Sequence, residues 1–195
     1  MTITLEQIKE LREKTAVSIA KCKEALEETN GDLEKAIIVL RKKGLETANR
    51  KLERETKEGI IAYYVHTNKK VGAMVELYCE TDFVAKNPDF EALGRDLAMQ
   101  VVASSPRAVR PEEIDESEIE QEKNIYFEQL QKSGKPADII EKAMVGKVTK
   151  FKEENALLTQ AFVKDPSRKV GDLINDAVGK LGENIQVGRF VRYQI

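Results

Sequence analysis

Few side chains in this sequence could carry out covalent chemistry. The chain of 195 residues has one histidine, His66, and two cysteines, Cys22 and Cys79. A tetrahedral zinc site needs four ligands, and no carboxylates stand at a spacing that would complete one. His66 and Cys79 fall on one predicted hairpin, where a rise of ~3.3 Å per residue separates them by roughly 26 Å, too far for a nucleophile and its base. We therefore expect no metal site, no cofactor and no enzymatic covalent chemistry.

A second group of side chains stands where one apolar run ends and the next begins. Val71 to Leu77 alternates like a strand, and Asn87 can cap a following helix, so Thr81 to Ala85 should form a short connection. The residues allow two interpretations of this connection. Either Phe83 folds back onto the core and Asp82 is solvated, or Phe83 is presented to a partner and Asp82 perturbs something bound there.

Length, charge and hydropathy limit the class of protein. A chain of this length can hold a mid-sized domain and a small module. With 32 basic and 34 acidic residues the net charge is −2, so no overall field attracts nucleic acid. Met1 to Lys9 does not resemble a signal peptide, and no apolar run approaches the ~18 residues that span a bilayer. We expect a cytoplasmic protein with reduced cysteines, no membrane contact and no direct contact with nucleic acid.

Residues 1–45 are predicted to form a compact module of three short helices. Their starts and ends are marked by capping and turn residues: Thr4 with Gln7, Ser18 and Asp32 at the starts, and Asn30-Gly31 and Gly44 at the ends. Residues 46–58 have mixed charge and a single sizeable apolar side chain, that of Leu52. This segment is interpreted as a charged, solvated helical linker.

Residues 59–195 are predicted to form an α+β core. Ile60 to Val65 and Val71 to Cys79 indicate an antiparallel hairpin, and Ile185 to Ile195 alternates as a third strand of the same sheet. Between them, helices are expected at these places: Asn87 to Ser104, Asp115 to Gly134, Pro136 to Phe151 and Val170 to Leu181, with an extended Ala156 to Val163.

Both faces of the predicted hairpin are apolar. If Asn68 and Lys69 form its turn, one face carries Ile60, Ala62, Tyr64, Val71, Ala73, Val75 and Leu77, and the other carries Ile61, Val65, Met74 and Tyr78. We expect helices on one face, and either more of the chain or a second subunit on the other.

Several motifs, in order along the whole chain, resemble those of the bacterial translation elongation factor Ts family. They are Leu11 to Thr15, Cys22 to Leu26, Asn30 to Asp32, Leu40 to Gly44, Glu80 to Ala85, Gly134 to Pro136, Phe162 to Asp165 and Gly182 to Ile185. The resemblance is to the short form of the family, which has one core subdomain and works as a homodimer. It implies that the three-helix module is similar to a ubiquitin-associated fold.

The resemblance implies a guanine nucleotide exchange factor for elongation factor Tu, a GTPase of translation. In the family the loop matched here by Thr81, Asp82, Phe83 and Val84 is pushed in beside the nucleotide's Mg²⁺ site. Secondary contacts with the GTPase are implied for three further positions: Arg12, Lys23 and Gln100. The alternative is a non-catalytic scaffold or a ribosome-associated binding module on the same fold.

Two positions depart from the family pattern. Lys21 stands where members commonly have aspartate, which reverses a charge at the expected docking surface of the helical module. Gln100 stands where members often have a histidine that disturbs the phosphate loop of the GTPase. Glutamine forms hydrogen bonds but does not become a cation.

Overall fold

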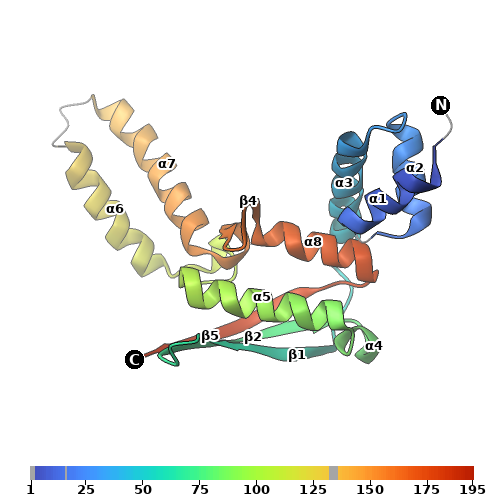
Figure 1. Cartoon of the computed structure of the whole chain (residues 1–195). Coiled ribbons are helices and arrows are strands. Elements are labelled where there is room, and N and C mark those ends of the chain that lie inside the picture. Colours follow the sequence, from blue (N-terminus) through green and yellow to red (C-terminus); the bar gives the residue numbers. More distant parts are fainter. Residues whose placement is uncertain (1–2, 16, 132–135) are drawn as a thin grey trace. The chain divides into compact units, whose positions relative to one another are not determined.

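A computed structural model describes residues 3–15, 17–131 and 136–195 (Figure 1). Its main elements, in chain order, are α1 (Leu5–Thr15), α2 (Ile19–Glu28), α3 (Leu33–Lys51), β1 (Glu58–Val65), β2 (Val71–Cys79), α4 (Asp82–Ala85), α5 (Pro88–Ser104), α6 (Glu116–Gln131), α7 (Ala137–Asn155), β3 (Ala161–Phe162), β4 (Asp165–Lys169), α8 (Val170–Leu181) and β5 (Gln186–Gln194). Strands β1, β2 and β5 form an antiparallel sheet in the order β1-β2-β5, which confirms the predicted α+β class.

Two compact units can be distinguished. The first consists of Met1–Ile61, Glu76–Gly94 and Asp172–Val187, and the second of Ala62–Val75, Arg95–Gly171 and Gly188–Ile195. Each unit therefore contains part of the sheet. The predicted division into residues 1–45, 46–58 and 59–195 does not coincide with these units and stays a prediction.

The helices of the amino-terminal module begin and end where the sequence predicts, with one exception. Thr4 and Gln7 form the capping box, because each backbone N–H donates to the other side chain at 3.0 and 3.2 Å. Asp32 Oδ1 accepts from the Lys35 amide at 3.0 Å at the start of α3. After α2, Asn30 and Gly31 adopt positive φ angles of 53° and 85°, which reverse the chain.

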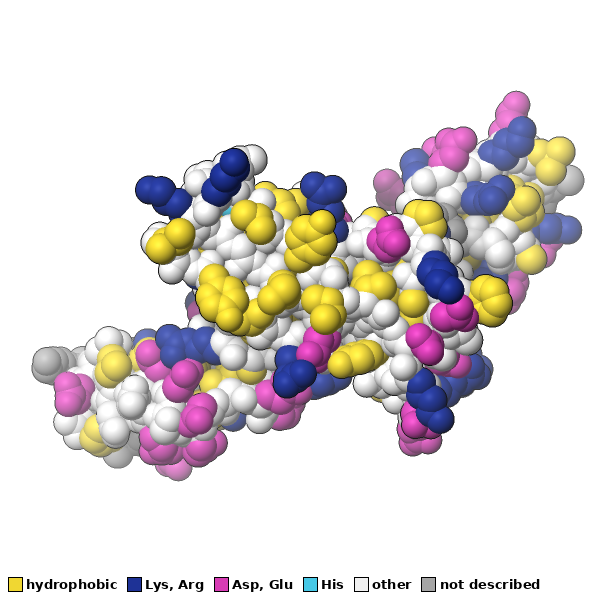
Figure 2. Space-filling model, turned by 90° about the horizontal axis from the view of Figure 1, so that it is seen from below, with side chains coloured by type: hydrophobic (Ala, Val, Ile, Leu, Met, Phe, Trp, Pro, Cys, Tyr) yellow, Lys and Arg dark blue, Asp and Glu magenta, His cyan; other side chains and the backbone are white. Residues whose placement is uncertain are grey.

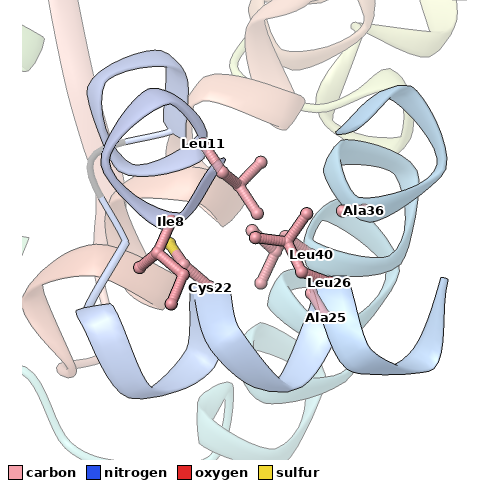
Figure 3. Close-up of a cluster of buried hydrophobic side chains, with 7 residues drawn as sticks. All are labelled: Ile8, Leu11, Cys22, Ala25, Leu26, Ala36 and Leu40. Atoms are coloured by element: carbon pink, nitrogen blue, oxygen red, sulfur yellow. The ribbon is translucent and has the colours of Figure 1, made fainter. Parts of the chain in front are cut away.

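The core of this module is small and closely packed (Figure 3). It consists of Ile8, Leu11, Cys22, Ala25, Leu26, Ala36 and Leu40. The isoleucine and the three leucines are the large side chains of this core, and the cysteine and the two alanines are small. The helices can therefore approach one another closely, but the apolar area that they bury is limited.

The prediction that Gly44 ends the third helix is wrong, because α3 continues to Lys51. Ala48, in the additional turn, is only 5 % exposed. At Gly44, α3 approaches α8 so closely that a Cβ built on Gly179 would lie 3.6 Å from the Gly44 Cα. Tertiary packing thus offsets the ~1 kcal/mol that a glycine costs inside a helix. Only residues 52–57 of the predicted linker lie outside regular structure.

The two faces of the hairpin differ as predicted. Helix α5 covers one face of the sheet (Figure 1). Ala62, Ala73, Val75 and Leu77 are buried and alternate along the strands with exposed residues, so they share one face. Side chains on the opposite face are exposed, among them Ile61, Tyr63, Val65, Met74 and Tyr78. In the second unit, Arg192 Nε also donates to the Val102 carbonyl at 3.2 Å and joins β5 to α5.

The second unit also contains helices α6 and α7. A buried cluster connects them to the rest of this unit and consists of Ala108, Ile114, Ile119, Phe151 and Ala156. Helix α7 runs through Gly146, where a Cβ would meet open space. Gly134, the predicted end of the preceding helix, lies outside the described residues.

The segment after α7 differs from the extended run that the sequence predicts. Leu157–Thr159 form a 3-10 turn, and Ala161–Phe162 pair with β4 in a short hairpin. Strand β4 has the sequence Asp-Pro-Ser-Arg-Lys, which lacks the apolar alternation of a strand. No helix in the described ranges is long and apolar enough to cross a membrane.

Candidate functional site

The connection between β2 and α5 contains a single turn of helix, α4 (Figure 1). Its backbone hydrogen bonds run from the Ala85 amide to the Thr81 carbonyl and from the Lys86 amide to the Asp82 carbonyl, both at 3.1 Å. Asn87 then caps α5, since its Oδ1 accepts from the Asp89 amide at 2.9 Å. The turn is therefore bounded by a strand on one side and a capped helix on the other.

The ring of Phe83 points into solvent, and the residue is 84 % exposed. Ala85, two positions later, is buried, while Val84 is half-buried. Two residues span about 200° around a helix, so burial of Ala85 turns Phe83 outward. The interpretation in which Phe83 folds back onto the core is wrong for this structure.

Asp82 forms an ion pair with Lys86 one turn later, with Lys86 Nζ 2.7 Å from Asp82 Oδ2. This hydrogen bond holds the pKa of Asp82 below its ordinary value and raises the pKa of Lys86. Both groups are exposed to solvent, so they can exchange this pairing for one with another molecule at little cost.

The start of the turn is held from two directions. Thr81 donates its amide and its hydroxyl to the carboxylate of Glu183, at 3.0 and 2.6 Å. The thiol of Cys79 donates to the Thr81 carbonyl at 3.2 Å. Burial, together with the charge of Glu183, raises the pKa of Cys79 to about 11, so the thiol keeps the proton that it donates at neutral pH.

The residues of the helical module that were predicted to contact a partner are at the surface. Arg12 lies exposed on α1, and Lys23 lies exposed on α2 at 3.7 Å from Glu27 Oε1. Lys21, which reverses a charge relative to the family pattern, donates its ammonium to the carbonyl of Gly179 at 3.4 Å. The extra positive charge therefore has an intramolecular acceptor near the carboxyl end of α8, where the helix dipole favours cations.

The prediction of a partner contact from Gln100 requires correction, because this side chain is 0 % exposed. Its Nε2 donates to Gln160 Oε1 at 3.2 Å and to the Ala161 carbonyl at 3.1 Å, and its Oε1 accepts from the Val163 amide at 2.8 Å. Its amide thus joins the part of α5 that belongs to the second unit to the segment of the same unit that contains β3.

Sequence reasoning assigned no role to Glu183 and Asn184. Glu183 contacts Thr81 across 102 residues of sequence, a pairing that local patterns do not reveal. The only signal was the resemblance of Gly182 to Ile185 to a family motif. Among the described residues, no group of three or more histidine, cysteine, aspartate or glutamate side chains is arranged to hold a metal ion.

An exposed aromatic ring on a rigidly held turn is typical of a protein that acts by binding another macromolecule. Comparison with known proteins agrees with this class. The family model described as "Elongation factor TS" matches residues 2–195. A protein named elongation factor Ts from Thermosipho melanesiensis is 53 % identical over 193 residues, which cover 99 % of this chain and 98 % of the relative.

Two further relatives carry the same name. The protein from Fervidobacterium nodosum is 54 % identical over 195 residues, with 100 % of this chain and 99 % of the relative covered. The protein from Thermodesulfovibrio yellowstonii is 52 % identical over 195 residues, with 100 % and 97 % covered. The chain belongs to the elongation factor Ts family.

Proposed function

We propose that the protein is a guanine nucleotide exchange factor for elongation factor Tu, acting in the cytoplasm without covalent chemistry of its own. Membership of the family supports the partner and the reaction. The observation that carries the proposal is the outward ring of Phe83 on a turn that is held at both ends.

In the proposed mechanism Phe83 is inserted beside the Mg²⁺ that bridges the nucleotide phosphates and the GTPase. Mg²⁺ requires near-ideal geometry, so a bulky ring that moves its supporting residues removes much of the electrostatic attraction for GDP. Val84 extends the apolar contact, and Asp82 brings a negative charge near the phosphates. Thr81 holds the turn to the rest of the subunit.

Exchange then follows from linkage between two ligands of the GTPase. If the factor weakens GDP binding by a given ratio, GDP weakens binding of the factor by the same ratio. Excess nucleotide displaces the factor and completes the cycle. Arg12 and Lys23 supply a secondary electrostatic contact from the helical module, which accelerates encounter more than it strengthens binding.

Gln100 has an indirect part in this proposal. Because its side chain is buried and its amide is bonded to Val163 and Ala161, it supports α5 instead of touching the GTPase. No direct contact with nucleic acid and no metal or cofactor of the protein's own is required.

We further propose that the protein is a homodimer joined through the exposed face of the sheet. Figure 2 shows hydrophobic side chains gathered on the face seen from below, over the strands. In the second unit they line a groove formed by Tyr63, Val65, Met74, Tyr193 and Ile195. Exposed apolar patches of this kind usually mark interaction sites, and pairing of two copies through this face would cover the patch on each copy.

The central test is a stopped-flow measurement of fluorescent GDP leaving elongation factor Tu. The wild-type protein should accelerate release strongly, and Phe83→Ala should lose most of the acceleration while still binding the GTPase. Phe127→Ala, which removes another exposed phenylalanine on α6, is the matched control and should behave like wild type. If the wild-type protein binds without accelerating release, the protein is a scaffold and the exchange function is refuted.

A further inference from the structure

We propose that Glu183 is a positioning residue that fixes the direction of the Phe83 ring, an inference that rests on the proposed exchange function. One Glu183 oxygen, Oε2, accepts from the amides of Glu80 and Thr81, both at 3.0 Å. The other, Oε1, accepts from the Thr81 hydroxyl at 2.6 Å. A single carboxylate thus receives three donors from the residues that lead directly into α4.

The arrangement is reciprocal. Glu80 Oε1 accepts from the amide of Asn184 at 2.6 Å, so each glutamate binds the backbone of the other's segment. Arg54 lies 3.5 Å from Glu80 and offsets part of the repulsion between the two carboxylates. Hydrogen bonds that involve a charged acceptor are short and strong, and four of them converge on two neighbouring peptide segments.

The segment that carries Glu183 is itself anchored. Gly182 adopts a φ of 81°, which turns the chain sharply after α8. Lys51 at the end of α3 donates to the Gly182 carbonyl. Asn184, only 1 % exposed, donates its amide to the carbonyls of Leu52 and Arg54 at 3.4 and 2.7 Å. Glu183 therefore connects this anchored turn to Glu80 and Thr81, the residues that lead into α4.

The consequence concerns the rate more than the affinity. Phe83 is exposed, so packing contacts do little to fix its ring, and the direction of the ring depends on its rotamer and on the orientation of the α4 backbone that carries it. Without Glu183 the amides of Glu80 and Thr81 lose their acceptor, and the first turn of α4 samples more orientations. A ring that is presented less often in the productive direction lowers the maximal rate of GDP release, whereas the rest of the docking surface is unchanged.

Three substitutions separate positioning from a direct charge contact with the GTPase. Glu183→Gln keeps the length of the side chain, and its Oε1 can still accept from both amides. Glu183→Asp keeps the charge but is one methylene shorter, and Glu183→Ala removes every acceptor. Positioning predicts that Gln retains most of the activity, whereas Asp and Ala reduce the maximal rate about tenfold, the effect of roughly one strong hydrogen bond.

The measurement is the rate of fluorescent GDP release against factor concentration, which yields a maximal rate and a half-saturating concentration. We expect the half-saturating concentration to change little. Glu118→Ala, which removes a carboxylate paired with Arg107 at 2.7 Å, is the matched control and should match wild type. If Asp retains activity and Gln loses it, the carboxylate acts by charge and the inference is overturned.

Amide hydrogen exchange tests the positioning without any GTPase. In Glu183→Ala the amides of residues 80–87 should exchange faster than in wild type, while those of the amino-terminal module should not. Unchanged protection at Glu80 and Thr81 would overturn the inference. A wild-type protein that fails to accelerate GDP release refutes the proposed function alone, since the amide measurement still decides whether Glu183 orders the turn.

Discussion

The ammonium of Lys86 lies 2.7 Å from the carboxylate of Asp82, the residue that directly precedes the exposed Phe83. The pair lies at the surface, so it adds little to stability. It does place one positive and one negative charge beside the ring that is proposed to enter the partner.

The first prediction concerns the titration of this pair. The pKa of Asp82 is lowered from its ordinary value of 3.8, so the pairing is complete above that pH and is lost as the pH falls through the lowered value. Lys86→Met should bring the pKa of Asp82 back up toward 3.8. Carboxyl carbon NMR across the acidic range measures this shift, and an unchanged midpoint would show that Lys86 does not interact with Asp82 in solution.

The second prediction compares two phenylalanines seven residues apart. Phe83 in α4 is exposed, whereas Phe90 in the first turn of α5 is 0 % exposed. Phe83→Ala should change the free energy of unfolding by less than about 0.5 kcal/mol, as is usual for surface sites. Phe90→Ala should lower it by about 3–5 kcal/mol, because it leaves a cavity. Denaturation by urea measures both, and a large loss for Phe83→Ala would mean that the ring packs against its own chain.

A third prediction follows from the burial of Gln100. Gln100→Ala leaves the amide of Val163 and the side chain of Gln160 without this partner, which should lower the free energy of unfolding by about 2–4 kcal/mol. Gln131→Ala, an exposed glutamine at the end of α6, serves as the control and should be neutral. A neutral Gln100→Ala would contradict the buried hydrogen-bond network.

The fourth prediction concerns Cys79, whose pKa is raised from 9.0 to about 11. As the pH rises, Cys79 loses its thiol proton at a lower pH in the unfolded chain than in the folded protein. Its contribution to the stability of the folded state is therefore complete below pH 9 and is lost as the pH rises toward 11. In a Cys22→Ala background, Cys79 should react with iodoacetamide far more slowly in the native protein than in urea. Equal rates would show that the thiol is accessible and ionised.

Cys79→Ala provides the matching stability measurement. The difference in the free energy of unfolding between the Cys22→Ala protein and the double variant should shrink as the pH rises from 9 to 11. A difference that stays constant across this range would mean that the thiol titrates alike in the folded and unfolded chains.

The last prediction concerns the exposed face of the sheet. Met74→Asp places a charge in the groove between β2 and the end of the chain and should convert the proposed dimer into a monomer. Light scattering should give twice the chain mass of 22.0 kDa for wild type and the single mass for the variant. Ile139→Asp, on exposed α7, should remain dimeric. A monomeric wild type refutes the dimer.

The sequence alone was sufficient for features that depend on near neighbours. The capping box of Thr4 and Gln7, the cap at Asp32 and the left-handed turn at Gly31 are local hydrogen-bond and backbone preferences, and all are present in the structure. The alternation in Val71 to Leu77 likewise determined which side chains face the core, because successive residues of a strand point to opposite sides.

Tertiary structure decided what depends on distant partners. Helix α3 continues past Gly44 because α8 packs against it, and Gln100 is buried because residues 160–163 supply its hydrogen bonds. The sequence left open whether Phe83 points inward or outward. The buried side of a single helical turn depends on which neighbouring elements pack against it. Glu183 and Thr81 meet across 102 residues, and the energy of such a contact appears only when folding has brought the two segments together.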